Sequence, residues 1–485
     1  MFKVIGRSQT RAAGTRENRL PKFKGRFEDR KILSILDYYP FPTFRLGHEK
    51  ALEIIERHWK QFDVALIIAP MGSGKTALRR AIAYWTGKAA MTVPTNNLLE
   101  QEIRQFPNTH KIFRKNYYHC EFCYNLDMAS IKNHPQAPLL VVPHTYIAHK
   151  FRRPTLLVDE GHKLVDINTD LQATHIWRKD IDYPITTYTR EELVTYLQKI
   201  KEQYPGNTFS KYEKIIDKLE TNDYMIKREV QGFRGKGMDR ISIIPLYPET
   251  HPVLIKGVNK IILFSATLSQ EDVFDLGIGR HKKILKVELP SPIPKERRPL
   301  VLDYLGKLHR YNLKAKTPAI ARRIRRMRAD YLDKGKGLVH VTYELGKYLR
   351  TYLEKEDWII FHSKIDAKSK LAKWMESDPK EGKVFIASGF EEGLDLAGTD
   401  YHWQAIAKIM WPSLMDTAVR KKMEDNEAWY YWQALKKVMQ AYGRICRGPE
   451  DLGITHIWDE SFDRLYSQSL KHGLIPEYFR EVYPK

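Results

Sequence analysis

Short apolar runs followed directly by polar residues recur along the chain. Val64–Ile68 leads into Ala69-Pro-Met-Gly-Ser-Gly-Lys-Thr76, Thr155–Val158 into two acids, Lys260–Phe264 into hydroxyl residues, and Lys383–Ala387 into a loop with further acids. Apolar runs of this length, bounded by turn residues, are typical of buried strands. The pattern therefore predicts a series of strands, and the first of them runs into a glycine-rich turn and then a helix.

The turn after the first strand has the pattern of a phosphate-binding loop. Gly72 and Gly74, on either side of Ser73, let backbone N–H groups close around phosphate oxygens. Lys75 reaches the β and γ phosphates, and the Thr76 hydroxyl is placed to ligate Mg²⁺. The loop opens with alanine where the usual pattern has glycine. We therefore expect the chain to bind ATP, or another nucleoside triphosphate, with Mg²⁺.

The second strand ends in two adjacent carboxylates, Asp159 and Glu160. Asp159 can hold Mg²⁺ through water, and Glu160 can orient or deprotonate an attacking water molecule. A strand end with two solvated acids is the alternative, and the phosphate loop earlier in the chain makes it the weaker one. The two motifs together predict a site for nucleotide hydrolysis.

Two later segments supply further polar groups. Ser265 and Thr267 follow the strand at residues 260–264, and their hydroxyls can hydrogen-bond to the acid segment and report the state of the nucleotide. In the run Gln440-Ala-Tyr-Gly-Arg-Ile-Cys-Arg447, the glutamine and first arginine are four residues apart, as are the glycine and last arginine. On a helix, this spacing places them on one face.

The order of these motifs resembles the superfamily 2 helicases, and within them the XPD and DinG branch. The series is the phosphate loop, the Asp-Glu-Gly-His162 box, Ser-Ala-Thr267, Glu-Gly-Leu-Asp395 and Gln-x-x-Gly-Arg-x-x-Arg447. The segments Tyr39–His48, Val142–Tyr146 and Lys408–Asp416 add similarity at the level of the branch. The resemblance covers roughly residues 37 to 464.

The resemblance implies an α/β fold of two RecA-like parallel-sheet domains with ATP in the cleft between them. Residues 31–165 and 240–269 would form the first domain, 270–485 the second, and 166–239 a mainly helical Arch-like insert in the first. A helical insert that only buttresses the first domain is the alternative. Residues 1–30 read as a basic arm, which either follows a nucleic-acid backbone or is a solvated extension.

By position, the resemblance assigns functional residues to both sides of this cleft. The implied catalytic residues are Lys75, Glu160, Gln440, Arg444 and Arg447, with Thr76 and Asp159 at Mg²⁺. The implied nucleotide-binding residues include Arg45, His48 and Asp395, and the implied coupling residues are His162, Ser265 and Thr267. An arginine supplied across such a cleft is worth about 10³ to 10⁵ in rate. Domain closure would therefore gate hydrolysis and drive movement along a strand. His48 replaces the glutamine usual in the branch, which leaves base specificity open.

Charge and composition indicate a polyanionic partner. The 485 residues carry a formal net charge of +22, with a pI near 9.5, and neutralising phosphates with lysine and arginine releases condensed counterions. The first thirty residues have no apolar core of the kind that export requires, and no apolar run approaches the length of a membrane span. We expect a soluble, cytoplasmic protein.

Cysteine usage bears on cofactors. The chain has three cysteines, Cys120, Cys123 and Cys446, which fits a reducing compartment. Members of the XPD and DinG branch often carry a four-cysteine iron–sulfur cluster between the phosphate loop and the acid box, and only Cys120 and Cys123 lie there. An iron–sulfur cluster is therefore not expected. A zinc site is one alternative for this pair, and a metal-free remnant is the favoured one. The nearby histidines are His110, His119 and His134.

Two other segments have competing interpretations. The helix expected after Thr317-Pro318 carries an apolar stripe and five arginines. These arginines either hold phosphates or form a solvated face, which the pattern favours. Residues 429–432 are four adjacent aromatics that either stack on unpaired bases or belong in part to the core.

The leading hypothesis is an NTP-dependent helicase that translocates on single-stranded DNA, and the resemblance implies 5′ to 3′ movement. Single-stranded and forked DNA are the expected partners of a monomeric enzyme. An RNA helicase or remodeller is the second enzyme hypothesis. A strand-binding or annealing protein that nucleotide only switches is the hypothesis from another class.

Overall fold

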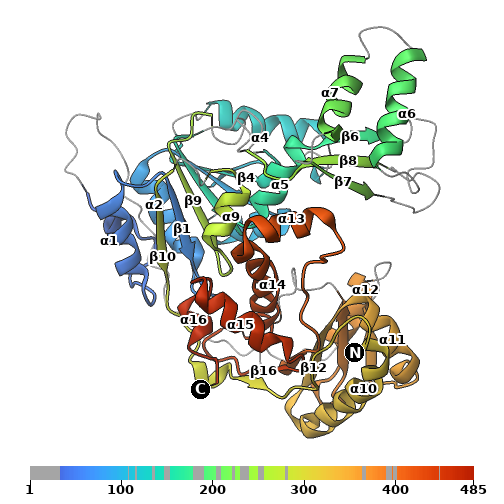
Figure 1. The fold of residues 1–485 in the computed structure, drawn as a ribbon. Helices are drawn as coiled ribbons and strands as arrows, with labels where there is room; N and C mark the ends of the chain where they lie inside the picture. Colours follow the sequence, from blue (N-terminus) through green and yellow to red (C-terminus); the bar gives the residue numbers. More distant parts are fainter. Residues whose placement is uncertain are drawn as a thin grey trace, which may run out of the picture.

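The structure is a computed structural model. It describes residues 33–106, 109–114, 117–118, 120–133, 137–146, 153–177, 190–203, 209–220, 224–229, 240–249, 256–278, 282–362, 367–388, 396, 401–446 and 448–484. Figure 1 shows two sheets, each with its own helices, and a smaller unit that projects from the first. None of the described helices is both long and apolar enough to cross a membrane.

A parallel sheet forms the first domain, with the described strands in the order β10-β1-β9-β5-β2-β4-β3. The strands are β1 (Val64–Ile68), β2 (Ala89–Val93), β3 (His110–Lys111), β4 (Leu139–Pro143), β5 (Thr155–Asp159), β9 (Lys260–Ser265) and β10 (Ile284–Glu288). Because Ile68 pairs with Ser265 and Asp159 with Phe264, the carboxyl ends of β1, β9 and β5 lie side by side. The polar residues after these strands therefore meet at one edge of the sheet.

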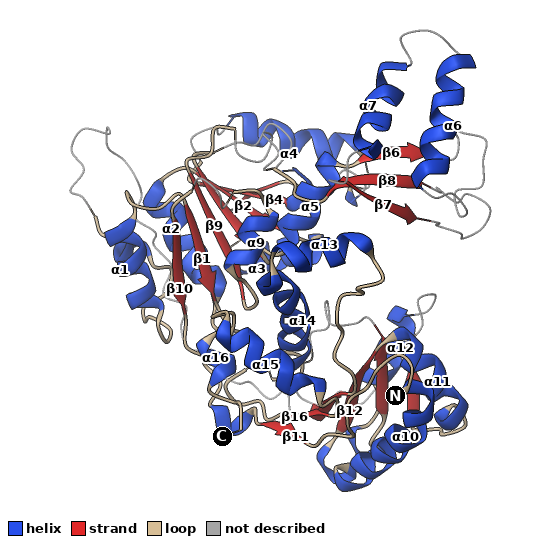
Figure 2. Ribbon diagram, in the orientation of Figure 1, coloured by secondary structure: helices blue, strands red, loops and turns tan. Residues whose placement is uncertain are grey.

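Helices cover both faces of this sheet (Figure 2). On one face, α1 (His48–His58), α2 (Lys75–Thr86) and α3 (Asn96–Gln105) share a core with Ala65 and Ile67 of β1. The other face, with Leu66, packs against α5 (Lys163–Gln172) and α9 (Gln270–Asp275). Helix α4 (Glu121–Asn133) lies against β3. Burial on both faces explains why β1 is apolar at every position.

The first domain extends further along the chain than the sequence predicts. The expected start of the second domain was residue 270, but α9 packs on the first sheet and Ile284 of β10 pairs with Val64 of β1. Strand β10 is half exposed at the sheet edge and carries Lys286 and Glu288, so its hydrophobic pattern is weak. The boundary therefore moves to the segment between β10 and the first strand of the second sheet at residue 300.

The projecting unit combines helices with a small antiparallel sheet (Figure 1). Its strands are β6 (Thr174–Trp177), β7 (Tyr224–Glu229) and β8 (Arg240–Pro245), in the order β6-β8-β7. Helices α6 (Arg190–Gln203) and α7 (Phe209–Glu220) share a core with this sheet. The sequence predicts the helices but not the sheet, because short edge strands give little periodicity. The predicted limits of the insert also shift, since α5 belongs to the first domain and β8 to the insert.

A second parallel sheet has the described strand order β11-β16-β15-β12-β14-β13. Its strands are β11 (Leu300–Leu302), β12 (Lys336–Val341), β13 (Ile359–Phe361), β14 (Val384–Ser388), β15 (Tyr401–Ile406) and β16 (Ile454–Ile457). Helices α10 (Leu313–Asp330), α11 (Tyr343–Leu353) and α12 (Ala367–Met375) surround it. The predicted architecture of two parallel-sheet domains is confirmed.

Helix α10 differs in detail from the predicted helix. It begins at Leu313, and Pro318 therefore lies inside the helix and not at its start. The side chain of Leu313 is fully buried. Arg323 forms an ion pair with Asp303 at 2.6 Å. The other four arginines of the predicted run lie on the same helix. One of them, Arg325, forms an ion pair with Glu356 at 2.9 Å. Arg322, Arg325 and Arg326 are exposed, as the favoured interpretation of a solvated face predicts, whereas Arg323 and Arg328 are half-buried.

Helix α14 (Glu427–Tyr442) joins the two domains. It packs against α13 (Thr417–Asp425) and α15 (Ser461–Lys471), while α16 (Glu477–Arg480) lies near the same core. Trp432 Nε1 and Lys436 Nζ each donate to Asp272 of α9 at 3.0 Å. Tyr431 and Trp432 are buried, so these aromatics pack the core and are not free to stack on bases.

Candidate nucleotide site between the two domains

The phosphate loop connects β1 directly to α2. Gly72 and Gly74 have φ angles of +72° and +82°, a left-handed conformation that glycine adopts without steric cost. Gly74 is the residue before the first turn of α2 and has no side chain to cap it. Ala77 N of that turn donates to Gly74 O at 3.0 Å, which leaves the N–H groups of Lys75 and Thr76 for an anionic ligand, as in other phosphate sites at helix N-termini.

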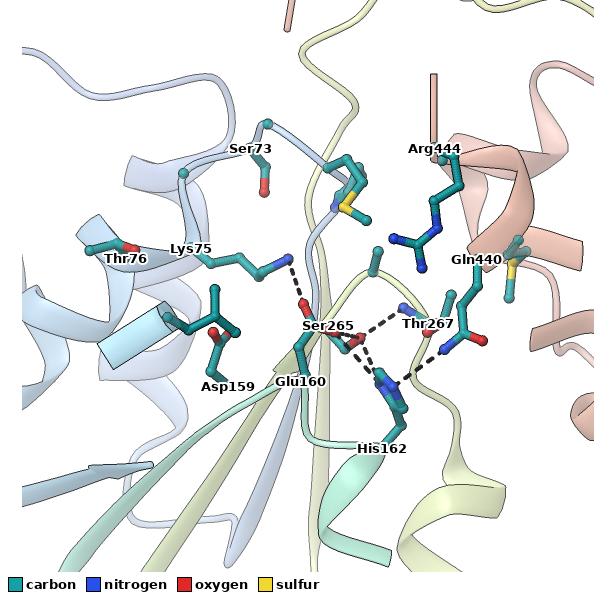
Figure 3. Close-up of a pocket in the computed structure, with 18 of the residues that line it drawn as sticks. Ser73, Lys75, Thr76, Asp159, Glu160, His162, Ser265, Thr267, Gln440 and Arg444 are labelled. Atoms are coloured by element: carbon teal, nitrogen blue, oxygen red, sulfur yellow. Dashed lines mark hydrogen bonds and ion pairs between the residues drawn. The ribbon is translucent and has the colours of Figure 1, made fainter. Parts of the chain in front are cut away.

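A cavity of about 540 Å³ opens above this loop (Figure 3). Its walls are the loop, the start of α3, the segments after β5 and β9, and the C-terminal end of α14. Figure 3 shows Lys75 and Glu160 approaching from the first domain, and Gln440 and Arg444 from the second. The cavity thus brings together residues that are more than 350 positions apart in the sequence.

His48 and Arg45 support the loop from behind. His48 is fully buried, and its Nε2 lies 2.6 Å from the carbonyl oxygen of Ser73. Because a carbonyl only accepts, Nε2 carries the proton and Nδ1 accepts from Tyr39 Oη at 2.7 Å. Burial lowers the pKa of His48 and favours this neutral form. Arg45 packs on Gly74, where an added Cβ would lie 2.6 Å from Arg45 Nη1. Both predicted nucleotide-binding residues therefore contact the loop.

The acid box turns sharply after β5. Glu160 has a φ of +48°, unusual for a residue with a side chain, and Gly161 N donates to Phe264 O at 3.0 Å. A Cβ on Gly161 would lie 2.8 Å from Leu263 Cβ. Close packing against β9 thus explains why this chain has glycine at the third position of the box.

Glu160 is held in its ionised form by its neighbours. Its Oε1 lies 3.5 Å from Lys75 Nζ, and its Oε2 accepts from Ser265 Oγ at 2.9 Å. Burial alone would raise the pKa of Glu160, but Lys75 first, followed by His162 and the Ser265 hydrogen bond, lowers it to about 2. The carboxylate is therefore charged at neutral pH and pointed at the phosphate-binding lysine.

A chain of hydrogen bonds connects Glu160 to the second domain. Ser265 Oγ donates to Glu160, so it can only accept from His162 Nδ1, which lies 3.1 Å away. His162 Nε2 then accepts from Gln440 Nε2 at 3.3 Å. Thr267 N also donates to Ser265 Oγ at 3.2 Å. His162 and Ser265 therefore form a directed path from α14 to the acid box, and Thr267 joins it through its backbone N–H and not through its hydroxyl.

Thr76 and Asp159 lie on the other side of Lys75, around a buried arginine that the sequence analysis did not identify. Arg79 Nη1 lies 2.6 Å from Asp159 Oδ1, and Arg79 Nη2 donates to Thr76 Oγ1 at 2.9 Å. Thr76 Oγ1 donates to Glu102 of α3 at 3.0 Å. A hydroxyl and a buried carboxylate oxygen beside the phosphate loop are donors that suit Mg²⁺. The chemistry of these two donors therefore fits the predicted metal site, although Asp159 Oδ1 is paired with Arg79.

The second domain reaches the phosphate loop at the end of α14. The sequence predicts one helix face for the glutamine and the first arginine, but α14 ends at Tyr442 and Arg444 lies in the following turn. The Arg444 side chain is buried and lines the cavity. A Cβ on Gly443 would lie 3.3 Å from Met71 of the loop. The turn after α14 therefore leaves no room for a side chain at Gly443 beside the phosphate loop.

Comparison with known proteins identifies the fold. Residues 339–477 match the family model of the helicase C-terminal domain. A solved XPD helicase structure has a TM-score of 0.59 at 16% identity and covers 89% of this chain and 98% of that chain. The chain has the XPD helicase fold. An apo XPD structure has a TM-score of 0.57 at 16% identity and covers 87% of this chain and 98% of that chain. Xpd4 of S. tokodaii has a TM-score of 0.55 at 13% identity and covers 87% of this chain and 96% of that chain. Comparison with curated protein sequences gives no match.

The XPD helicase fold confirms the predicted resemblance and the two RecA-like domains. Two of the site residues predicted from that resemblance, Asp395 and Arg447, lie outside the described residues. The other predicted residues of the phosphate loop, the acid box and the coupling set line the cavity or contact its walls. Similarity at 13–16% identity establishes the fold but not the activity. The activity depends on the residues of this site.

The pair Cys120 and Cys123 lies at the start of α4, away from the cavity. Both thiols are exposed, with the sulfurs 2.9 Å apart, and the hydrogen bond from Cys123 lowers the pKa of Cys120. His119 and His134, suggested as zinc ligands, lie outside the described residues. Among the described residues, no group of three or more His, Cys, Asp or Glu side chains is placed to hold a metal ion. The zinc hypothesis stays a prediction.

Sequence reasoning missed the buried ionic cluster of Arg79, Arg80 and Glu102. Arg80 Nη2 lies 3.2 Å from Glu102 Oε2, and Arg79 contacts the other oxygen of the same carboxylate. One signal was present, because Arg79 follows Lys75 and Thr76 at helical spacing and must share their face of α2. The partner, Glu102, lies on another helix and gives no local signal.

Proposed function

We propose that this chain is an ATP-dependent helicase that moves along single-stranded DNA and unwinds duplexes. The observation that carries the proposal is the hydrogen-bonded path from Gln440 through His162 and Ser265 to Glu160. It joins an uncapped phosphate loop in one domain to a helix that crosses from the other. A site of this kind makes hydrolysis depend on the relative position of the domains.

The first domain supplies the groups that act on the nucleotide. Lys75 Nζ lies 3.5 Å from Glu160 Oε1 and pairs with it. The β and γ phosphates compete for this lysine, so nucleotide binding draws Lys75 away from the carboxylate. Loss of the lysine removes the largest influence that lowers the Glu160 pKa, and Glu160 becomes a better acceptor for a proton of the attacking water. Substrate binding therefore activates the base.

Thr76 and Asp159 are the residues that would hold Mg²⁺. The ion would neutralise charge on the β and γ phosphate oxygens and align them for displacement. The phosphate loop provides N–H donors to the same oxygens.

The second domain completes the site. Arg444 lines the cavity opposite Lys75, and a guanidinium in this position can stabilise charge that develops on the transferring phosphoryl group. The residues that bring it there belong to the turn after α14, where Gly443 lies so close to the loop that an added Cβ would be 3.3 Å from Met71. Separation of the domains would withdraw Arg444 and break the Gln440–His162 hydrogen bond together.

The choice of DNA rests on the sequence resemblance to the XPD and DinG branch, which also implies 5′ to 3′ movement. The net charge of +22 supports a polyanionic partner of either chemistry. Single-stranded and forked DNA, bound by a monomer, are the proposed substrates. RNA is the competing one, and the test below separates the two.

Steady-state ATP hydrolysis by the purified chain tests the proposal. It is measured alone, with single-stranded DNA and with single-stranded RNA of the same sequence, and the Lys75→Ala variant serves as the blank. Stimulation by DNA alone supports the proposal, and unwinding of duplexes with 5′ or 3′ tails then gives the direction. Stimulation by RNA alone would make RNA, and not DNA, the substrate of the helicase. Strand binding without stimulated hydrolysis would favour a nucleotide-switched binding protein and refute the helicase.

A further inference from the structure

Arg79 lies where the two predicted metal ligands meet. It follows Thr76 by one helical turn on α2, and its side chain is only 4% exposed. One end of the guanidinium is 2.6 Å from Asp159 Oδ1, and the other donates to Thr76 Oγ1 and to Glu102 Oε1. Both residues that would hold Mg²⁺ are thus engaged by an internal cation.

The surroundings keep this cation charged. Arginine stays protonated in proteins, and here two carboxylates, Asp159 and Glu102, lie against the guanidinium at 2.6 and 2.5 Å. Without Arg79, the Asp159 carboxylate would be buried with no positive partner at this distance, which is costly. The guanidinium therefore neutralises the Asp159 carboxylate.

We propose that Arg79 is a positioning residue that holds Asp159 in the absence of nucleotide and releases it when the nucleotide arrives with Mg²⁺. The proposal rests on the nucleotide site described above. Glu102 contacts Arg79 independently of Asp159, so the guanidinium keeps a buried partner after it gives up the acid box. Mg²⁺ must displace Arg79 to reach Asp159, and free Mg²⁺ therefore binds poorly without the phosphates that come with the nucleotide.

Arg80 provides a matched control within the same helix. It is fully buried and pairs with the same Glu102, through Oε2 at 3.2 Å. Its guanidinium donates to Thr109 Oγ1 at 2.9 Å and lies 4.2 Å from the centre of the Phe106 ring. Arg80 thus shares the burial and the acidic partner of Arg79 but faces away from Asp159.

The experiment compares the full-length wild type with Arg79→Met and Arg80→Met, since methionine keeps part of the apolar stem and removes the charge. Thermal unfolding is followed during titration with MgCl₂ alone. We expect Mg²⁺ to stabilise Arg79→Met at concentrations about tenfold lower than those needed by the wild type or Arg80→Met. Equal Mg²⁺ dependence in all three proteins overturns the proposal, because a purely structural role would affect both arginine variants alike.

Binding of a fluorescent ATP analogue gives a second readout. In EDTA, the wild type should bind the analogue more tightly than Arg79→Met, because the guanidinium still neutralises Asp159 near the incoming phosphates. In excess Mg²⁺, the difference should disappear. A difference that persists unchanged in excess Mg²⁺ contradicts the proposal.

Arg79→Lys covers the case in which Arg79→Met does not fold. Lysine keeps the charge but cannot bridge two carboxylates in the way a guanidinium does. Its Mg²⁺ midpoint should fall below that of the wild type, and an unchanged midpoint contradicts the proposal. If the wild type binds no nucleotide even in excess Mg²⁺, the proposed function fails, while the titration with Mg²⁺ alone still decides the role of Arg79.

Discussion

Strands β1 and β12 are both interior strands of a parallel sheet and both lead into a helix, yet only the connection after β1 has the features of a nucleotide site. After β1, residues 69–74 form a loop with left-handed glycines, and α2 begins without a side-chain cap. After β12, the single residue Thr342 leads into α11, and its hydroxyl accepts from Leu345 N at 3.3 Å. One helix leaves its first N–H groups for a ligand, and the other satisfies one of them internally.

This difference shows that the capacity to bind phosphate depends on the segments that connect strands to helices and not on the sheets themselves. Both sheets are parallel and buried, and both direct the carboxyl ends of their strands to one edge. The second domain contributes to the cavity through the end of α14, which lies outside its sheet. A fold can therefore carry two similar domains of which one binds the phosphates and the other completes the site.

The largest expected effect comes from Glu160→Gln. Glutamine keeps the shape of the side chain but cannot accept a proton from water, so the hydrolysis rate should fall by about 10² to 10⁴. The control is Glu344→Gln in the first turn of α11, at the equivalent edge of the second sheet, which should keep the wild-type basal rate. Steady-state hydrolysis measures both. A normal rate for Glu160→Gln would remove the base assignment.

A second prediction concerns the glycine that leaves α2 uncapped. An alanine Cβ at position 74 would lie 2.6 Å from Arg45, at a φ of +82°, so Gly74→Ala should lower nucleotide affinity by about 100-fold as the loop shifts. Gly87→Ala is the control, because Gly87 at the other end of α2 has a φ of +69° and nothing within 4 Å. Both variants should lose about 1 kcal/mol of unfolding free energy.

Titration with a fluorescent ATP analogue and urea unfolding separate these two effects. Gly87→Ala should share the loss of stability and keep nucleotide affinity. If the two variants bind nucleotide equally well, the left-handed loop is not the phosphate site.

The residues that the first domain contributes to the site could be predicted because each of them lies close in sequence to the strand that positions it. The residues of the phosphate loop, and the pair Asp159 and Glu160, each lie within a few positions of a strong apolar strand, so strand ends and helix starts fix their roles. Arg444 was predicted on a helix and lies just past its end, since a boundary depends on caps and tertiary packing.

Other features depend on partners far away in the chain. The role of His48 as a support for Ser73 O needs a contact across 25 positions. Arg79 needs Glu102, and the insert sheet needs β6 to pair with β8 across a segment that reads as helical. No local pattern reports such pairings. Strand β10, whose hydrophobic pattern is weak, was assigned to the wrong domain for the same reason.

A third prediction tests whether the second domain contributes through α14. Gln440→Ala removes the donor to His162, so the hydrolysis stimulated by nucleic acid should fall by about tenfold while nucleotide affinity is kept. Gln433→Ala, two turns earlier on the same helix, is the control and should behave as the wild type. Rates are compared with and without saturating strand. Equal stimulation in both variants would show that the path through His162 does not couple the domains.

The smallest effect is expected from Thr342→Ala, which uncaps α11. Loss of the hydrogen bond to Leu345 N should cost about 1 kcal/mol, the usual effect of removing a threonine cap, and lower the unfolding temperature by about 2–4 °C. Nucleotide affinity should stay at the wild-type value, because α11 is not preceded by a loop with left-handed glycines like the one before α2. Thr351→Ala, near the end of α11 with a hydroxyl bonded to Tyr348 O, controls for loss of a threonine. A change in nucleotide affinity would mean that this edge of the second sheet takes part in binding, and the contrast between the two connections would no longer explain where the nucleotide goes.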